Sequence, residues 1–371
     1  MELLRFLVLV LVLGFSGSCV AVDFNVNDFA SLVAGEVRSG DVEVSEYIDY
    51  DCPCFIADYN NGTLYEDGEL RLDYESRAGI QLNIVFTDAF SLVTQAVYRA
   101  IDSEASIEWA YLSWNISPSW TFQAGRKRIP MYYYSEFQDV GLSYTWVRPP
   151  QALYGWEASN YNGGSLRYTG GVGDWNLTAS VYAGSEEVDD APYTRIYDFV
   201  AQDVKWDNIR GGDIEVSYEW FTGRFIYMTS ENSITEKPDS SAFSAPATEQ
   251  TVMGLALNGD FGNWFVLTEF NVNTRENSGT GLDVEAPAVM LGTGYRMGQF
   301  TPFVSWSRYW EKSADLEIYE PERFTDLSFT LRYDINASNA LKFQIDQYKD
   351  KTSYGFVGDT TVMTLVYDLV F

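Results

Sequence analysis

The chain has 371 residues, 16% of them aromatic and 46% hydrophobic, and its formal net charge at pH 7 is -29. So acidic a chain is a poor partner for nucleic acid, because neutralising phosphates requires a basic surface. Histidine is absent from the sequence, which excludes Ser-His-Asp and Cys-His catalysis and every metal site that uses imidazole. Paired carboxylates remain possible in so acidic a chain, but none sits in a catalytic motif. Glu186, Glu187, Asp189 and Asp190 could hold calcium, although solvated loop charge is favoured, so we expect neither an enzyme nor a protein that carries a metal or another cofactor.

The first 21 residues have the layout of a secretory signal peptide. Arg5 precedes a long apolar run, and small residues follow at Cys19 and Ala21. We expect cleavage after Ala21, which divides the chain into a signal peptide, residues 1–21, and a mature domain, residues 22–371. A lipidated N-terminus at Cys19 is the alternative. Beyond this segment no apolar run approaches the roughly 18 residues that a membrane-spanning helix needs.

Two cysteines remain in the mature domain, Cys52 and Cys54, on either side of Pro53. They could form a loop disulfide, belong to a metal site with distant further ligands, or stay as two loop thiols. Zinc sites usually take four nitrogen or sulfur ligands at regular spacing. An exported chain meets an oxidising compartment, so we favour the disulfide.

Alternation with a period of two residues is the strongest structural signal in the sequence. From 70 to 86 one parity is apolar and the other is almost entirely polar or charged, and the same split recurs at 213–220, 326–335 and 341–346. In an extended chain successive side chains point to opposite faces. A soluble antiparallel sheet would also alternate, with its apolar side inward. These segments are numerous, long and aromatic, which favours a wall between lipid and water.

Short turns alternate with long polar connections along the chain, as in transmembrane antiparallel β-barrels. The expected short links are Thr87-Asp88, Pro118-Ser119, Thr222-Gly223, Phe261-Gly262 and 336–339, and the long connections include 187–208, 235–248 and 276–283. Counting the alternating segments from 29–38 to 360–371 gives about 16 strands. The sequence thus predicts an all-β transmembrane barrel over residues 22–371, with no second domain.

The last segment, TTVMTLVYDLVF, places Tyr367, Leu369 and Phe371 on one apolar parity. It resembles the C-terminal assembly signal of Gram-negative outer-membrane barrels, which the insertion machinery recognises by a terminal aromatic residue and alternating apolar residues. This resemblance implies a location in the bacterial outer membrane. It also implies contacts with outer-membrane lipid, lipopolysaccharide and the barrel assembly machinery.

A second resemblance, to porins including the phosphate-selective group, lies in residues 125–156. A strand at 120–125 leads into a long segment that does not alternate cleanly and contains Pro130, Pro149 and Pro150. In porins a loop at such a position folds into the barrel and narrows the lumen. The phosphate-selective members line their pore with many Lys and Arg residues. This acidic chain lacks that surplus, so phosphate selectivity is not expected.

If this segment enters the lumen, its charged groups become candidates for a constriction, where opposed charges sort solutes and ions. They are the basic residues Arg126, Lys127, Arg128 and Arg148 and the acidic residues Glu136 and Asp139. Alternatively, 126–128 lie at the rim and bind lipid headgroups or lipopolysaccharide phosphates. Other basic residues are scattered on the polar parity of the strands and are the candidate basic residues of the pore wall. They are Arg71, Arg77, Arg99, Arg167 and Arg332.

The resemblance to porins implies a water-filled channel for passive diffusion of small polar solutes and ions. Porins of this size usually form homotrimers, so the same is expected here, and the acidic excess predicts a mild preference for cations at low salt. A different class of protein also fits, namely a plugged structural or adhesion barrel whose acidic loops bind a partner. A secreted soluble all-β binding protein is the third alternative.

Overall fold

The computed structural model describes residues 22–41, 52–66, 68–197, 200–237, 247–277, 279, 281–314, 316, 319–352 and 357–371. The expected signal peptide, residues 1–21, lies outside the described residues, as does the cleavage position after Ala21. Among the helices of the described residues, none has the length and apolar character needed to cross a membrane.

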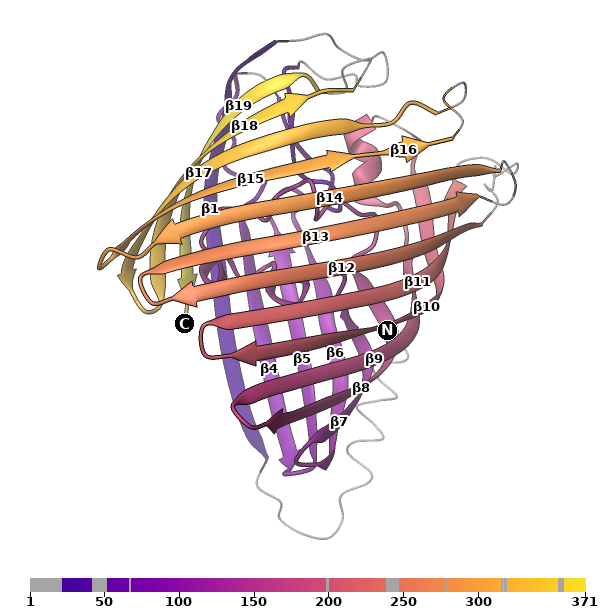
Figure 1. Cartoon of the computed structure of the whole chain (residues 1–371), viewed down its shortest axis with the longest axis vertical. Helices are drawn as coiled ribbons and strands as arrows, with labels where there is room; N and C mark the ends of the chain where they lie inside the picture. Colours follow the sequence, from indigo (N-terminus) through magenta and orange to yellow (C-terminus); the bar gives the residue numbers. More distant parts are fainter. Residues whose placement is uncertain are drawn as a thin grey trace.

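Within the described residues, sixteen antiparallel strands form one closed barrel, whose strands run obliquely around it (Figure 1). They are β1 (Asp23–Asp41), β4 (Arg77–Thr87), β5 (Phe90–Arg99), β6 (Glu104–Ser117), β7 (Trp120–Arg128), β8 (Asn160–Val172), β9 (Trp175–Val188), β10 (Gln202–Tyr218), β11 (Phe221–Glu236), β12 (Thr248–Phe261), β13 (Trp264–Asn277), β14 (Leu282–Tyr295), β15 (Phe300–Trp310), β17 (Arg323–Asn336), β18 (Asn339–Asp350) and β19 (Asp359–Val370). The long strand β1 closes the barrel because it pairs with both β4 and β19. The predicted fold class and strand number are confirmed.

Side chains of opposite polarity cover the two faces of the wall. On β10, Ile214 is 51% exposed whereas its neighbour Asp213 is 5% exposed, and on β18, Leu341 is 37% exposed whereas Lys342 is 1% exposed. The apolar parity therefore covers the outside and the polar parity faces the lumen, the space inside the barrel. This distribution is the reverse of a soluble sheet, which turns its apolar side inward.

The predicted strand at 70–86 is too long. The strand β4 begins only at Arg77, because the chain bends before it, and Arg71 instead bridges to Gly35 of β1 through two backbone hydrogen bonds. Leu70 and Leu72 are exposed in this bent segment. The assignment of Arg71 to the pore wall as a strand residue is therefore wrong.

Short turns gather at one end of the barrel and longer connections at the other, as expected from the alternation (Figure 1). The predicted turn at Thr222-Gly223 is displaced, since both residues lie in β11 and the turn occupies 219–220. Exposed aromatic side chains surround the short-turn end, namely Phe90, Trp114, Trp120, Trp175, Trp220, Phe261, Trp264 and Phe300. Such a ring is typical of the aromatic girdle where a barrel wall meets the membrane surface.

Two long connections fold into the lumen. One carries a small hairpin of β2 (Phe55–Asp58) and β3 (Thr63–Tyr65), and the other spans residues 129–159 with the 3-10 turns η1 (Ser135–Phe137) and η2 (Gly141–Ser143). Their apolar side chains pack in one buried cluster with inward residues of the wall, as Trp146 does with Phe303. The predicted inward-folded loop is thereby confirmed, and most of the apolar core lies inside the barrel.

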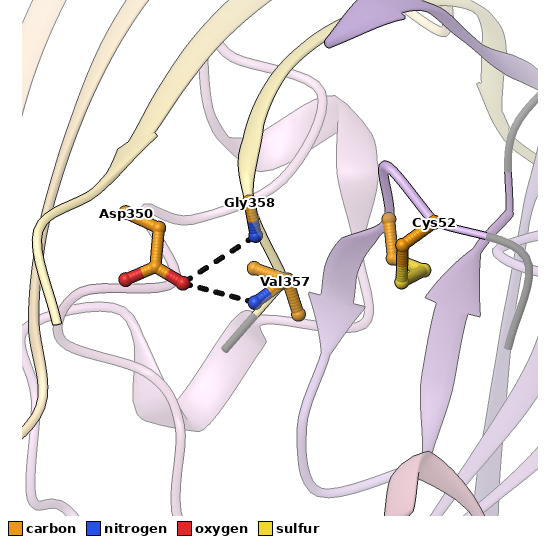
Figure 2. Close-up of a disulfide and its surroundings, with 5 residues drawn as sticks. Cys52, Asp350, Val357 and Gly358 are labelled. Carbon is orange, nitrogen blue, oxygen red and sulfur yellow. Dashed lines mark hydrogen bonds between the residues drawn. A yellow bond between two sulfur atoms is a disulfide. The ribbon is translucent and has the colours of Figure 1, made fainter. Parts of the chain in front are cut away.

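The hairpin is attached at its base near a disulfide (Figure 2). Cys52 and Cys54 are bonded to each other, as favoured from the sequence, and the Cys54 backbone N–H donates to the carbonyl oxygen of Val357 at 3.2 Å. Asp350, the last residue of β18, accepts hydrogen bonds from the backbone N–H groups of Val357 and Gly358 at 2.9 and 3.4 Å. The hairpin therefore rests on the connection between β18 and β19.

Candidate functional site

The candidate site is the inward segment, residues 129–159, together with the wall groups that bind it. The strand β7 ends at Arg128, and Pro130 follows it, a residue that cannot donate to a strand ladder. Pro149 and Pro150 lack the same donor further along. The segment therefore leaves the sheet and has to satisfy its polar groups against the polar inner wall.

Asp139 is bound by two arginines of the wall. Arg99 of β5 contacts Asp139 at 2.8 Å and Glu108 of β6 at 2.7 Å, and Arg128 forms ion pairs with the same two carboxylates, at 3.0 Å to Glu108. Burial disfavours the charged carboxylate of Asp139, but Arg128 and Arg99 hold its pKa below the ordinary value. The inward segment is thus joined to three neighbouring strands by an ionised, charge-balanced group.

Arg148 forms a second buried contact, with groups beside and on β18 and β19. Its guanidinium donates to both oxygens of Glu75, at 2.7 and 2.6 Å, to Asp346 at 2.7 Å and to the hydroxyl of Thr364 at 2.7 Å. Burial opposes ionisation of Glu75, yet Arg148 keeps its pKa below the usual range. Glu75 also accepts from the Tyr65 hydroxyl at 2.8 Å, so this ion pair unites the hairpin, the inward segment and the wall.

Three further wall cations bind main-chain carbonyl groups of the inward segment. Arg77 donates to the Asp139 carbonyl at 2.8 Å, and Arg332 donates to the carbonyls of Leu142 and Tyr144 at 2.9 and 2.8 Å. Lys342 donates to the carbonyls of Gly141 and Trp146 at 2.6 and 2.9 Å and lies 2.8 Å from Asp368. These contacts satisfy backbone acceptors that the irregular segment leaves without strand partners.

The other predicted constriction residues are more scattered. Arg126 pairs with Glu186 of β9 at 2.7 Å, Glu136 pairs with Arg167 of β8 at 3.1 Å, and Lys127 donates to Ser165 at 3.2 Å. Arg128 and Asp139 are brought together, whereas Arg126 and Arg148 lie in separate contacts. Of the predicted wall arginines, Arg77, Arg99, Arg167 and Arg332 all bind the inward segment. Their roles in solute passage stay predictions.

Several residues that hold the segment were not predicted. Glu269 of β13 accepts from the Tyr133 backbone N–H at 2.9 Å and from the Tyr154 hydroxyl at 3.0 Å, and Gln344 accepts from the Val147 backbone N–H at 2.8 Å. In the sequence they look like ordinary members of the polar parity. The apolar residues 55–57 and 64–65 in an otherwise polar connection could have indicated the hairpin.

The cavities beside the inward segment are small. One of about 80 Å³ lies between the hairpin, the inward segment and β5, and one of about 160 Å³ lies near β13 and the connection from β15 to β17. A wider cavity of about 680 Å³ lies at the end with the longer connections, lined by both acidic and basic residues. Within the described residues, no group of three or more acidic or cysteine side chains is placed to hold a metal ion.

The residues of the expected assembly signal lie on β19 and just beyond it. The Tyr367 hydroxyl donates to Asn339 at 2.6 Å, and Phe371, 73% exposed, exchanges backbone hydrogen bonds with Asp28 of β1 at 2.9 and 3.0 Å. Leu369 is opposite Ala30 of β1 in the closing pair of strands. Recognition of this segment by an insertion machinery stays a prediction.

No protein-family model matches the chain, and no curated protein matches its sequence. Solved structures do match its fold. The outer membrane channel DcaP of Acinetobacter baumannii has a TM-score of 0.63 at 12% identity, with 97% of this chain and all of that chain covered. In vitro folded OmpT, an outer membrane protein of Vibrio cholerae, has a TM-score of 0.60 at 10% identity, with 96% and 99% covered. An anion-selective porin from Comamonas acidovorans has a TM-score of 0.56 at 11% identity, with 95% and 100% covered.

These similarities extend over nearly the whole of each chain, and at such low identity they concern the fold alone. They agree with the closed barrel of this chain. In fold, the chain is similar to solved outer-membrane channels and porins.

Proposed function

We propose that this chain is an outer-membrane channel through which small hydrophilic solutes and ions diffuse passively. The observation that carries the proposal is a closed barrel, apolar outside and polar inside, with an inward segment bound to its wall by buried ion pairs. An apolar outer face suits acyl chains and a polar inner face suits water. The small cavities beside the inward segment favour a narrow passage and a low conductance.

The distribution of charge in the lumen favours cations. Arg99, Arg128, Arg148 and Arg167 are paired with carboxylates, so they contribute little net positive field. Among the described residues, several lumenal carboxylates have no basic side chain within ion-pair distance, namely Glu215, Glu269, Glu311, Glu322 and Asp326, against two lumenal cations without a carboxylate at that distance, Arg77 and Lys127. An acidic lumen raises the local concentration of cations.

Reconstitution in a planar bilayer tests both parts of this proposal. We expect small ohmic steps from the purified protein, and a reversal potential under a potassium chloride gradient that corresponds to cation preference. The preference should weaken at high salt, because the Debye length falls from about 10 Å at 0.1 M to about 3 Å at 1 M. Anion preference would overturn the charge argument while leaving the channel itself intact.

A plugged barrel with a structural or adhesive role is the second candidate. The packing of the hairpin and inward segment in one apolar cluster favours it, because such a cluster excludes water. The acidic connections at the far end would then bind a partner. Absence of conductance from well-folded, membrane-inserted protein would support this candidate against the channel.

We further propose export through cleavage of residues 1–21, insertion by the barrel assembly machinery, and residence among outer-membrane lipid and lipopolysaccharide as a homotrimer. One of the structurally similar proteins, OmpT of Vibrio cholerae, has a trimer form. Membrane fractionation with N-terminal sequencing tests export and cleavage. The mass of the native complex in mild detergent tests the oligomer, and a single-chain mass would contradict the trimer.

A further inference from the structure

A cavity of about 160 Å³ is lined neither by Asp139 nor by Arg148, the residues at the centre of the two buried ion-pair groups described above. It lies between the inward segment, β13 and the connection from β15 to β17, and we call it the loop-end pocket. Its wall includes Trp156, Arg275, Tyr309, Glu311, Tyr319 and Glu322. A cavity of about 150 Å³ is large enough for a molecule the size of benzene. The loop-end pocket can therefore hold a small organic molecule.

The acidic groups of the pocket outnumber its basic groups. Arg275 is its basic side chain, and it already forms an ion pair with Glu157 at 2.9 Å. Glu311, 7% exposed, accepts hydrogen bonds from the hydroxyls of Tyr309 and Tyr319, both at 2.7 Å, and from the Glu322 backbone N–H at 2.9 Å. The Glu311 charge is thus stabilised by neutral donors but not cancelled by a cation.

The carboxylate of Glu322 is the acidic group of the pocket that is left to bind a ligand. Among the described residues, no hydrogen bond or ion pair reaches its carboxylate, although that side chain is partly buried and lines the cavity. A partly buried carboxylate without a partner is costly. A bound cation would supply the missing partner at this position.

Aromatic rings make up much of the remaining wall. Tyr309 stacks on Phe324 at 5.0 Å between ring centroids, Phe324 packs against Tyr348 at 5.1 Å, and the Arg275 guanidinium already lies 4.5 Å from the centroid of Trp156. Aromatic faces attract organic cations and provide apolar contact for an aliphatic chain. Among the described residues, no three acidic side chains are placed together to coordinate a metal ion, so a compact, strongly hydrated metal ion suits this wall poorly.

We propose that the loop-end pocket binds a small organic cation, a primary ammonium group on a short aliphatic chain, with Glu322 as its ion-pair partner. The aliphatic part lies against the aromatic wall, and the net negative charge of the pocket rejects carboxylates. Binding at this site goes beyond the proposed channel, because it can be measured without any conductance.

Isothermal titration calorimetry of the detergent-purified chain with n-butylammonium chloride at pH 9, where Glu322 is mostly ionised, tests the inference. We expect saturable binding of one n-butylammonium ion per chain, weaker binding of the neutral isostere 1-butanol, and no binding of sodium butyrate. Comparable binding of butyrate, or no saturable binding of n-butylammonium, would overturn the proposal. These comparisons use the unaltered chain, so they do not depend on the folding of any variant.

Two matched variants locate the site. Glu322→Gln removes the charge while keeping the shape, and it should weaken n-butylammonium binding about tenfold, the loss of about 1.4 kcal/mol. Glu320→Gln makes the same change at a nearby exposed position outside the cavity wall and should leave the affinity within about twofold. If Glu322→Gln binds n-butylammonium as tightly as the unaltered chain does, Glu322 is not the ion-pair partner and the proposal is refuted.

Discussion

Arg148 and Asp346 form a buried ion pair at 2.7 Å, although 198 residues separate them in the chain. Arg148 belongs to the inward segment and Asp346 to β18. The same guanidinium binds both oxygens of Glu75, next to the hairpin. One side chain therefore connects three parts of the molecule that meet only in the folded barrel.

Replacing Arg148 with alanine should release this contact. The change leaves Glu75 and Asp346 buried without a cation, and breaking a buried pair in this way costs about 3–5 kcal/mol. We expect the inward segment to detach on this side, with a lower unfolding temperature on heat-modifiability gels and a larger single-channel conductance. Arg296→Ala, which removes an exposed ion pair with Asp260 at the short-turn end, serves as the control. Unchanged conductance and unchanged stability would contradict this role for Arg148.

Gly141 should tolerate no side chain. A Cβ at this position would overlap the carboxylate of Asp368 and come within 2.7 Å of the Ser31 hydroxyl, and its own carbonyl accepts from Lys342. We expect Gly141→Ala to displace the inward segment from β19 and to raise protease sensitivity within residues 129–159. Gly164→Ala is the control, because its nearest neighbour would lie 3.5 Å away. Equal digestion patterns would show that the segment adjusts without detaching.

The outer face of β17 can be tested with a charge. Phe329 is exposed at the middle of this strand, and an arginine at the bilayer midplane destabilises a barrel by about 2–4 kcal/mol. We expect Phe329→Arg to reduce folding into lipid vesicles, measured by the fraction of heat-modifiable protein. Leu316→Arg, at an exposed position in the connection from β15 to β17, should fold as the unaltered chain does. Tolerance of both changes would argue against lipid contact on this parity.

Stability should depend on the protonation of Glu322. Burial raises its pKa from 4.5 to about 8, with further increases from Glu311 and Asp350 and an opposing effect from Arg275. The folded chain thus holds this proton more tightly than the unfolded chain. The stabilising contribution is complete below pH 4.5 and is lost as the pH rises towards 8. We expect Glu322→Gln to lack this loss when unfolding temperatures are compared between pH 5 and 9.

The affinity of the loop-end pocket for n-butylammonium should rise over the same pH range. Proton and ligand compete for Glu322, so its deprotonation near pH 8 favours the ligand. Tyr319 stays protonated there, because burial and Glu311 raise its pKa, and an alkyl ammonium group keeps its charge up to about pH 10. Calorimetric titrations at pH 6, 7, 8 and 9 check this trend. A flat profile in the unaltered chain would show that Glu322 is ionised throughout.

The wall of the barrel could be predicted from sequence because its signal is local. Alternation at 213–220 determines which side of β10 faces outward, since strand geometry turns each residue opposite to the next. The same rule wrongly predicted a strand at Arg71. Apolar and polar residues still alternate there in the sequence, but the chain bends before β4 begins. Periodicity does not report where an extended segment leaves the sheet.

The contacts of the candidate site could be predicted only in part. Pro130 and the loss of alternation indicated the inward segment. Asp139 lies in this segment, whereas Arg128 is the last residue of β7 and binds Asp139 from the wall. The other wall partner of Asp139, Arg99, was recognised only as a polar-parity residue. Lys342 was missed for the same reason, because nothing local distinguishes a lysine that binds the segment from one that faces water. Such pairings depend on which strands lie opposite each other across the lumen, which is a property of the closed barrel.

The two edges of β1 have a consequence for biogenesis. This strand bonds to β4 on one side and to β19 on the other, and Asp28 meets Phe371 at the seam. Until β1 and β19 pair, each of these strands presents a row of unpaired amide and carbonyl groups, which can template association with other chains. A chain in which β1 and β19 have not yet paired therefore has two unprotected strand edges, and closure of the barrel removes both at once.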